Sequence, residues 1–127
     1  MYLGIDFGLR KIGIAYSEGI TATPLMVISN APSRMQQIKE KIHDDIKVAV
    51  IGIPNSMFTE QVNKLAEELK QTFDCEIVFQ DETNSSNEAL QVMIQSGLAK
   101  KNREMDDAHA AATILQRYLD EVVNKNV

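Results

Sequence analysis

The chain has 127 residues, of which 44% are hydrophobic and 24% are charged, and its formal net charge is −5. This size and composition are typical of one globular domain with its own core, and no apolar run is long enough to span a membrane. The acidic balance counts against broad, non-specific nucleic-acid binding, which needs a basic surface to displace counterions.

The sequence contains one cysteine, Cys75, so no disulfide can form within the chain. The N-terminal residues lack the basic region and small-residue cleavage site of a secretion signal. We therefore expect a cytoplasmic protein without a membrane partner, in which Cys75 is a small buried apolar side chain. No feature of the sequence indicates an oligomeric state.

The first third of the chain predicts three strands. Residues 2–7 and 11–16 are short apolar segments, and Leu9-Arg10 between them suits a tight hairpin turn. Residues 24–29 are rich in β-forming side chains and predict the third strand. Consecutive strands with short connections favour an antiparallel meander.

Helices and strands alternate in the rest of the chain. Residues 33–44 and 56–73 have apolar side chains at helical spacing, whereas 48–53 and 76–80 are continuous apolar runs typical of strands buried on both faces. Two further helices are expected, one ending at Gly97 and one starting near Asp106 with a face of small residues. The order predicts an α/β fold: a mixed five-stranded sheet, with three antiparallel and two parallel strands, flanked by helices.

Three carboxylates occupy positions that could carry chemistry. Asp6 lies in an apolar strand, where an unpaired charge is costly, although it could also bond the turn at Gly8. Glu82 follows a buried strand, but Asp81-Glu82 could equally begin a helix. Asp107 starts the last helix beside Asp106, and a helix cap accounts for one of the two.

Considered together, the three carboxylates indicate a site more strongly than any one of them does alone, because strand ends and helix starts in such folds can converge on one edge of the sheet. Asp6, Glu82 and Asp107 are oxygen ligands of the kind that Mg²⁺ or Mn²⁺ prefers. Two such ions can activate water and stabilise the leaving oxygen in phosphodiester hydrolysis. No Cys/His set suggests zinc, and His43 and His109 are expected to be structural or solvated.

Four segments resemble the YqgF-type family, whose members carry the names Holliday junction resolvase and pre-16S ribosomal RNA nuclease. They are GIDFGLRKIGIA at residues 4–15, VIGIP at 50–54, DET at 81–83 and DAHAAATILQ at 107–116. The resemblance covers nearly the whole chain and implies an RNase H-like fold with Asp6, Glu82 and Asp107 as the acidic cluster. It also implies a Mg²⁺- or Mn²⁺-dependent endonuclease acting on structured nucleic acid, either an rRNA precursor or a DNA junction.

The chain departs from the family pattern near the expected substrate. Thr83 stands where the family has an arginine, Leu9 stands where a small hydroxyl residue is common, and residues 55–60 lack the family's glycine-bearing loop. Cations that could replace the lost phosphate contact flank the acidic residues, although such charges often only face solvent. They are Arg10, Lys11, Lys100, Lys101 and Arg103.

Three functional hypotheses follow. The leading one is a nuclease that processes the 5′ end of pre-16S rRNA, with junction resolution as its alternative. A catalytically impaired module that binds nucleic acid or protein is favoured by the acidic charge and by Thr83. An actin-like ATPase shares the Asp-x-Gly hairpin at Asp6 but needs two such domains, which a chain of 127 residues does not supply.

Overall fold

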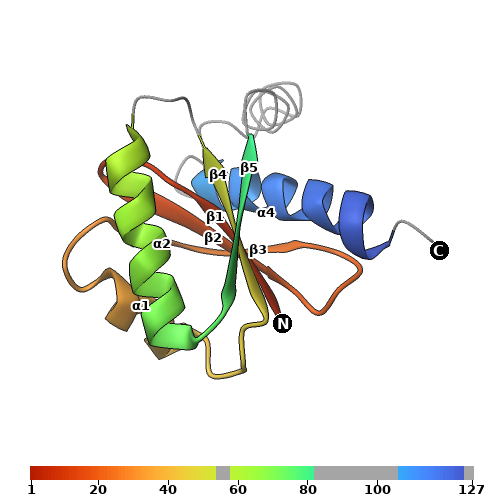
Figure 1. Cartoon of the computed structure of the whole chain (residues 1–127), viewed down its shortest axis with the longest axis horizontal. Helices are drawn as coiled ribbons and strands as arrows, with labels where there is room; N and C mark the ends of the chain where they lie inside the picture. Colours follow the sequence, from red (N-terminus) through yellow and green to blue (C-terminus); the bar gives the residue numbers. More distant parts are fainter. Residues whose placement is uncertain (54–57, 82–105, 125–127) are drawn as a thin grey trace.

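The structure, a computed structural model, describes residues 1–53, 58–81 and 106–124. Five strands form one sheet in the order β3-β2-β1-β4-β5, with β1 at its centre (Figure 1). The strands are β1 (Tyr2–Asp6), β2 (Lys11–Ser17), β3 (Thr23–Ser29), β4 (Val48–Ile53) and β5 (Glu76–Asp81). The first three pair antiparallel, and β4 and β5 are parallel to β1. This confirms the predicted RNase H-like mixed sheet.

Helices cover both faces of the sheet (Figure 1). On one face lie α1 (Arg34–Lys41) and α2 (Thr59–Phe73), and on the other lies α4 (Asp106–Tyr118), which continues into the π-helical turn η3 (Leu119–Val123). Two apolar clusters fill the two interfaces. Cys75 is buried, as expected, and His43 and His109 are exposed.

Side chains alternate between the two faces along each strand. Leu3, Ile5 and Phe7 pack in the cluster under α1 and α2, so the intervening residues of β1 face α4. Gly4 is on that second face, because a Cβ there would lie 2.7 Å from the carbonyl oxygen of Ala111 in α4. Asp6, two residues further along β1, shares the α4 face.

Some predicted boundaries shift. The helix expected over 33–44 ends at Lys41, because Ile42 takes extended backbone angles (φ −113°, ψ 114°) while its side chain stays buried. The helix expected over 56–73 begins at Thr59. The helix expected to end at Gly97 and the basic loop at 100–103 lie outside the described residues.

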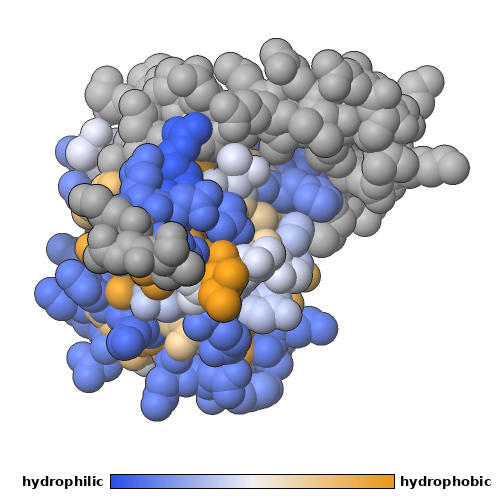
Figure 2. Space-filling model, turned by 90° about the vertical axis from the view of Figure 1, so that its right-hand side faces the viewer, coloured by the Kyte–Doolittle hydropathy of each residue, from blue (hydrophilic) through white to orange (hydrophobic). Residues whose placement is uncertain are grey.

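The end of the molecule that carries the C-terminal part of α4 is mostly hydrophilic, with a limited apolar patch (Figure 2). Here the side chains of Gln116 and Asn124 donate to the carbonyl oxygen of Ile20, which fastens the β2–β3 turn to the helix. In the described part of the chain, no helix combines the length and apolar character that crossing a membrane requires.

Candidate active site

Asp6 ends the central strand between two glycines. Its register partners are Gly13 on β2 and Gly52 on β4, neither of which has a side chain to cover the carboxylate. Asp6 is only 8% exposed. A carboxylate at this depth requires polar or cationic partners, since burying an isolated charge is costly. The sheet therefore supplies an acidic residue that no side chain of its two register partners crowds.

The start of α4 lies directly against this position. A Cβ added to Gly13 would come within 1.9 Å of the carbonyl oxygen of Asp107, so only glycine allows the helix to approach so closely. Gly13 is also the cross-strand partner of Asp6, and such partners have Cα atoms roughly 5 Å apart. Asp6 and the backbone of Asp107, which lie near opposite ends of the sequence, therefore both adjoin Gly13.

The electrostatics of Asp107 reflect a crowded, acidic environment. Burial raises the pKa of its carboxyl group above the ordinary value, and the adjacent charge of Asp106 raises it further. The ammonium group of Lys11 opposes both effects and lowers that pKa. Lys11, which the sequence suggests as a nucleic-acid contact, is therefore close enough to act on the Asp107 carboxylate while remaining exposed to solvent.

Asp106 adds an unsatisfied oxygen to this region. Its Oδ1 atom is buried and accepts no hydrogen bond from the described residues. A buried acceptor without a donor normally costs free energy, and a cation is one partner that would remove the cost. The oxygens here are hard carboxylate ligands, with no cysteine nearby, and this chemistry fits Mg²⁺ or Mn²⁺ better than zinc.

The third predicted carboxylate cannot be placed. Glu82 lies outside the described residues, as do Lys100, Lys101 and Arg103. The strand that precedes Glu82 does end at this edge, since Gln80 of β5 is the register partner of Gly52. Within residues 1–53, 58–81 and 106–124, no three His, Cys, Asp or Glu side chains are grouped to hold a metal ion.

The hairpin between β1 and β2 presents the remaining predicted residues. Leu9 and Arg10 are exposed at its tip, and Lys11 begins β2. Asn30 fastens this turn by donating from Nδ2 to the carbonyl oxygens of Gly8, at 2.8 Å, and Leu9, at 3.3 Å. Sequence reasoning missed the role of Asn30, because a single polar residue after a strand is common and carries no local signal of its partner.

Comparisons with known proteins give matches over nearly the whole chain. The model of the family RuvX, described as Holliday junction resolvase, matches residues 1–121. A protein of Sulfurihydrogenibium sp. (strain YO3AOP1) is 38% identical over 98% of this chain and 92% of its own length. One of Chlamydia pneumoniae is 36% identical with the same two coverages. Both bear the name "Putative pre-16S rRNA nuclease".

Solved structures show the same architecture at low sequence identity. The fowlpox virus resolvase, solved with Holliday junction DNA, superposes with a TM-score of 0.62 at 10% identity, covering 96% of this chain and 98% of its own. Thermus thermophilus RuvC, solved with a Holliday junction substrate, gives 0.57 at 14% identity and covers 96% of both chains. These two similarities establish the fold.

Proposed function

Since the chain belongs to the RuvX family, we propose that it is a divalent-cation-dependent nuclease that hydrolyses phosphodiester bonds in structured nucleic acid. The proposal depends on one observation: the backbone of Asp107 lies against Gly13, which is the register partner of Asp6. Two acidic residues a hundred positions apart in the chain that both adjoin one glycine support this proposal, since the fold alone does not require an acidic side chain at both positions. Glu82, which follows β5 in the chain, is the third proposed ligand.

In this proposal each group has a distinct task. Asp6, Asp107 and Glu82 hold Mg²⁺ or Mn²⁺, which supplies Lewis-acid stabilisation of charge on the phosphate oxygens. Lys11 and Arg10 bind the phosphodiester backbone next to the carboxylates and offset their repulsion of an anionic substrate. Lys100, Lys101 and Arg103 are proposed to extend this backbone contact.

We propose precursor 16S rRNA as the substrate. Support comes from the names of relatives that match almost the full length of this chain at 36–38% identity. A four-way DNA junction is the second candidate, because the matching family is described as a resolvase. Both substrates require the same hydrolysis and differ in the shape that the protein must bind.

The deciding experiment is a cleavage assay that offers both substrates to the same protein with Mg²⁺, Mn²⁺ or EDTA. We expect cleavage of the precursor RNA that depends on the cation. The cleavage rate should fall about 100-fold or more in Asp6→Asn and in Asp107→Asn, since removing a metal ligand should cost at least as much as removing a residue that only supports one. Asp44→Asn changes an exposed carboxylate in the loop after α1 and serves as the matched control.

Two outcomes would redirect the proposal. Cleavage of the junction alone would make DNA the substrate and leave the site assignment intact. No cleavage of either substrate, together with no saturable heat of Mn²⁺ binding in calorimetry, would leave a binding module on a nuclease fold.

A further inference from the structure

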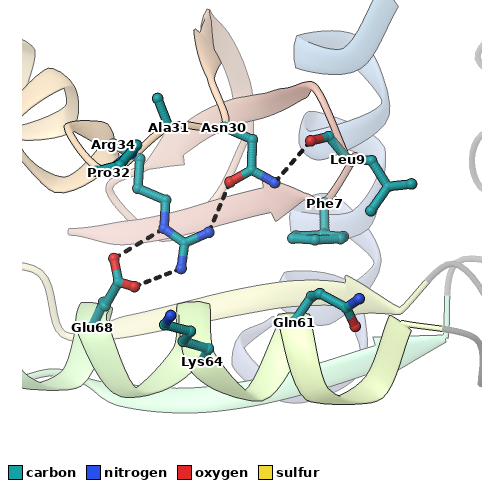
Figure 3. A pocket seen from close by; sticks show the side chains of 9 residues that line it. All are labelled: Phe7, Leu9, Asn30, Ala31, Pro32, Arg34, Gln61, Lys64 and Glu68. Carbon is teal, nitrogen blue, oxygen red and sulfur yellow. Dashed lines mark hydrogen bonds and ion pairs between the residues drawn. The ribbon is translucent and has the colours of Figure 1, made fainter.

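A pocket lies on the opposite face of the sheet from Asp6. It is an open pocket of about 490 Å³, within the usual range of ligand pockets. Phe7 and Leu9 of the β1–β2 hairpin form one wall, and Gln61 and Lys64 of α2 form the other (Figure 3). Because Phe7 follows Asp6 directly in the chain, the pocket and the candidate active site share one end of the central strand.

The floor of the pocket is held by a network of charged hydrogen bonds (Figure 3). The Nε and Nη2 atoms of Arg34 donate to the two carboxylate oxygens of Glu68, at 2.9 and 2.6 Å, and its Nη1 atom donates to Asn30 at 2.8 Å. Arg34 is only 8% exposed. Asn30 in turn holds the hairpin at Gly8 and Leu9. The pocket therefore has a fixed shape, linked to the turn that follows Asp6.

The two walls of the pocket carry exposed side chains that a ligand could contact. Leu9 is 57% exposed, so its apolar side chain is available to a ligand. Gln61 and Lys64 lie one helical turn apart, are exposed, and make no hydrogen bond or ion pair with any residue that the structure describes. Lys64 also acts electrostatically on Glu68, whose pKa it helps to lower, but with Arg34 already paired to Glu68 the charged side chains that line the pocket sum to one positive charge.

We propose that this pocket binds an unpaired nucleotide of the substrate strand, at the same end of β1 as the candidate active site. The base contacts the apolar side chain of Leu9, Gln61 offers amide hydrogen bonds to its edge, and the phosphate lies at Lys64. This assignment rests on the proposed nuclease function, because it is the shared end of β1 that makes a bound nucleotide useful there.

The chemistry of the pocket favours a nucleotide over other ligands. An apolar wall with a single ammonium group suits a base attached to one phosphate; proteins that bind single strands combine cations with aromatic side chains, and Phe7 and Lys64 line this pocket. A free metal ion is disfavoured, since Glu68, the only carboxylate among the described residues that line the pocket, is already bound by Arg34.

The test measures binding without cleavage. A labelled single-stranded RNA octamer and the DNA octamer of the same sequence are titrated into the full chain in EDTA, over a series of salt concentrations. We expect Lys64→Gln to weaken binding about fivefold at 0.1 M salt and to reduce the salt slope by about 0.7, which is the effect of losing one phosphate contact to a single strand. Lys70→Gln, on the same helix two turns away and also exposed, is the matched control and should bind normally.

A second measurement locates the ligand. In ¹⁵N–¹H spectra of the full chain, the octamer should shift the amide signals of Leu9, Gln61 and Lys64. Equal affinities and slopes for the two lysine variants would overturn the proposal, and so would shifts confined to other surfaces or no binding of either octamer. Because EDTA removes divalent cations, these failures are separate from a failure of the nuclease function, which appears as no cleavage with Mg²⁺ or Mn²⁺. Preference for one octamer identifies whether the nucleotide comes from RNA or DNA.

Discussion

The carbonyl oxygen of Asp107 occupies the space above Gly13 that any side chain would fill. Only 1.9 Å separates this oxygen from the position of a Cβ atom at residue 13, and the Asp107 carbonyl carbon is 2.2 Å from it. The contacting atoms belong to the backbone, so no change of side-chain rotamer can relieve such a clash. The helix that carries Asp107 can therefore reach β2, and through it Asp6, only because residue 13 is glycine.

Gly13→Ala should consequently damage both stability and the candidate site. The start of α4 would have to move, and we expect a loss of about 1–3 kcal/mol in the free energy of unfolding, as for other overpacked cores. Urea unfolding measures this loss, and calorimetry with Mn²⁺ measures the accompanying loss of cation affinity. A variant with wild-type stability and wild-type Mn²⁺ affinity would show that α4 does not need this close approach.

The same contact illustrates how far the sequence can be interpreted. The central strands were predicted correctly because a continuous apolar run as short as residues 48–53, followed by a proline, is typical of a buried strand. Gly13 is visible in the sequence as a glycine inside a strand, but its partner Asp107 is far away in the chain. No local pattern indicates which helix will lie over a given strand residue, so the contact appears only in the folded structure.

The differences between the predicted and the observed helices also have local causes. Ile42 continues the spacing of Met35 and Ile38, and the periodicity therefore predicted a helix that includes it. In the structure Ile42 is buried from an extended segment instead, which shows that a loop can fill the same apolar position as another helical turn. The π-helical turn at Leu119–Val123 has no sequence signal that distinguishes it from the preceding α-helix.

Glu68 should contribute pH-dependent stability. Its hydrogen bonds and ion pair with Arg34 lower the pKa of the carboxyl group below its usual value of 4.5. A lowered folded-state pKa stabilises the protein above the unfolded pKa, and this contribution is lost as the pH falls from about 4.5 through the folded value. We expect Glu68→Gln to cost about 1–3 kcal/mol at pH 7, partly because it leaves Arg34 buried without its carboxylate, and less at pH 3.

Urea unfolding of the wild type and Glu68→Gln at both pH values measures this difference. The double variant Arg34→Met/Glu68→Gln completes the cycle, and it should be more stable than the sum of the two single losses predicts, because no buried charge is left unpaired. A Glu68→Gln effect that is the same at pH 3 and pH 7 would contradict ion pairing as its cause.

Asn30→Ala should slow catalysis more than it destabilises the fold. The substitution removes the side-chain bonds to Gly8, Leu9 and Arg34. Of the bonds that residue 30 makes to the turn that follows Asp6, only the backbone bond to Arg10 then remains. We expect kcat to fall about tenfold, since small displacements of a reacting group are costly, with little change in KM. Hydrogen exchange at the amides of residues 8–11 should become faster, which a purely global loss of stability would not confine to this turn.

Gln37→Ala is the control for that variant. Gln37 also bonds the end of β3, through the backbone N–H and carbonyl groups of Ser29, but it does not touch the hairpin. It should lower stability to a similar extent and leave kcat unchanged. If both variants reduced kcat equally, the effect would come from the strand end and not from the hairpin.

Divalent cations should stabilise the folded protein through the start of α4. A cation that binds only the folded state stabilises it by mass action, by about 2.7 kcal/mol at a concentration 100 times its dissociation constant. The buried Oδ1 of Asp106 has no donor in the described chain, and burial, together with the charge of Asp106, raises the pKa of Asp107; a bound cation would offset both costs. Saturating Mn²⁺ should therefore raise the free energy of unfolding of the wild type by an amount of this order.

Asp107→Asn should lose most of the increase, whereas Asp44→Asn, whose exposed carboxylate lies in the loop after α1, should keep it. An equal increase in all three proteins would mean that the cation acts on the general acidic surface, and the carboxylates beside Gly13 would then have no special affinity for it.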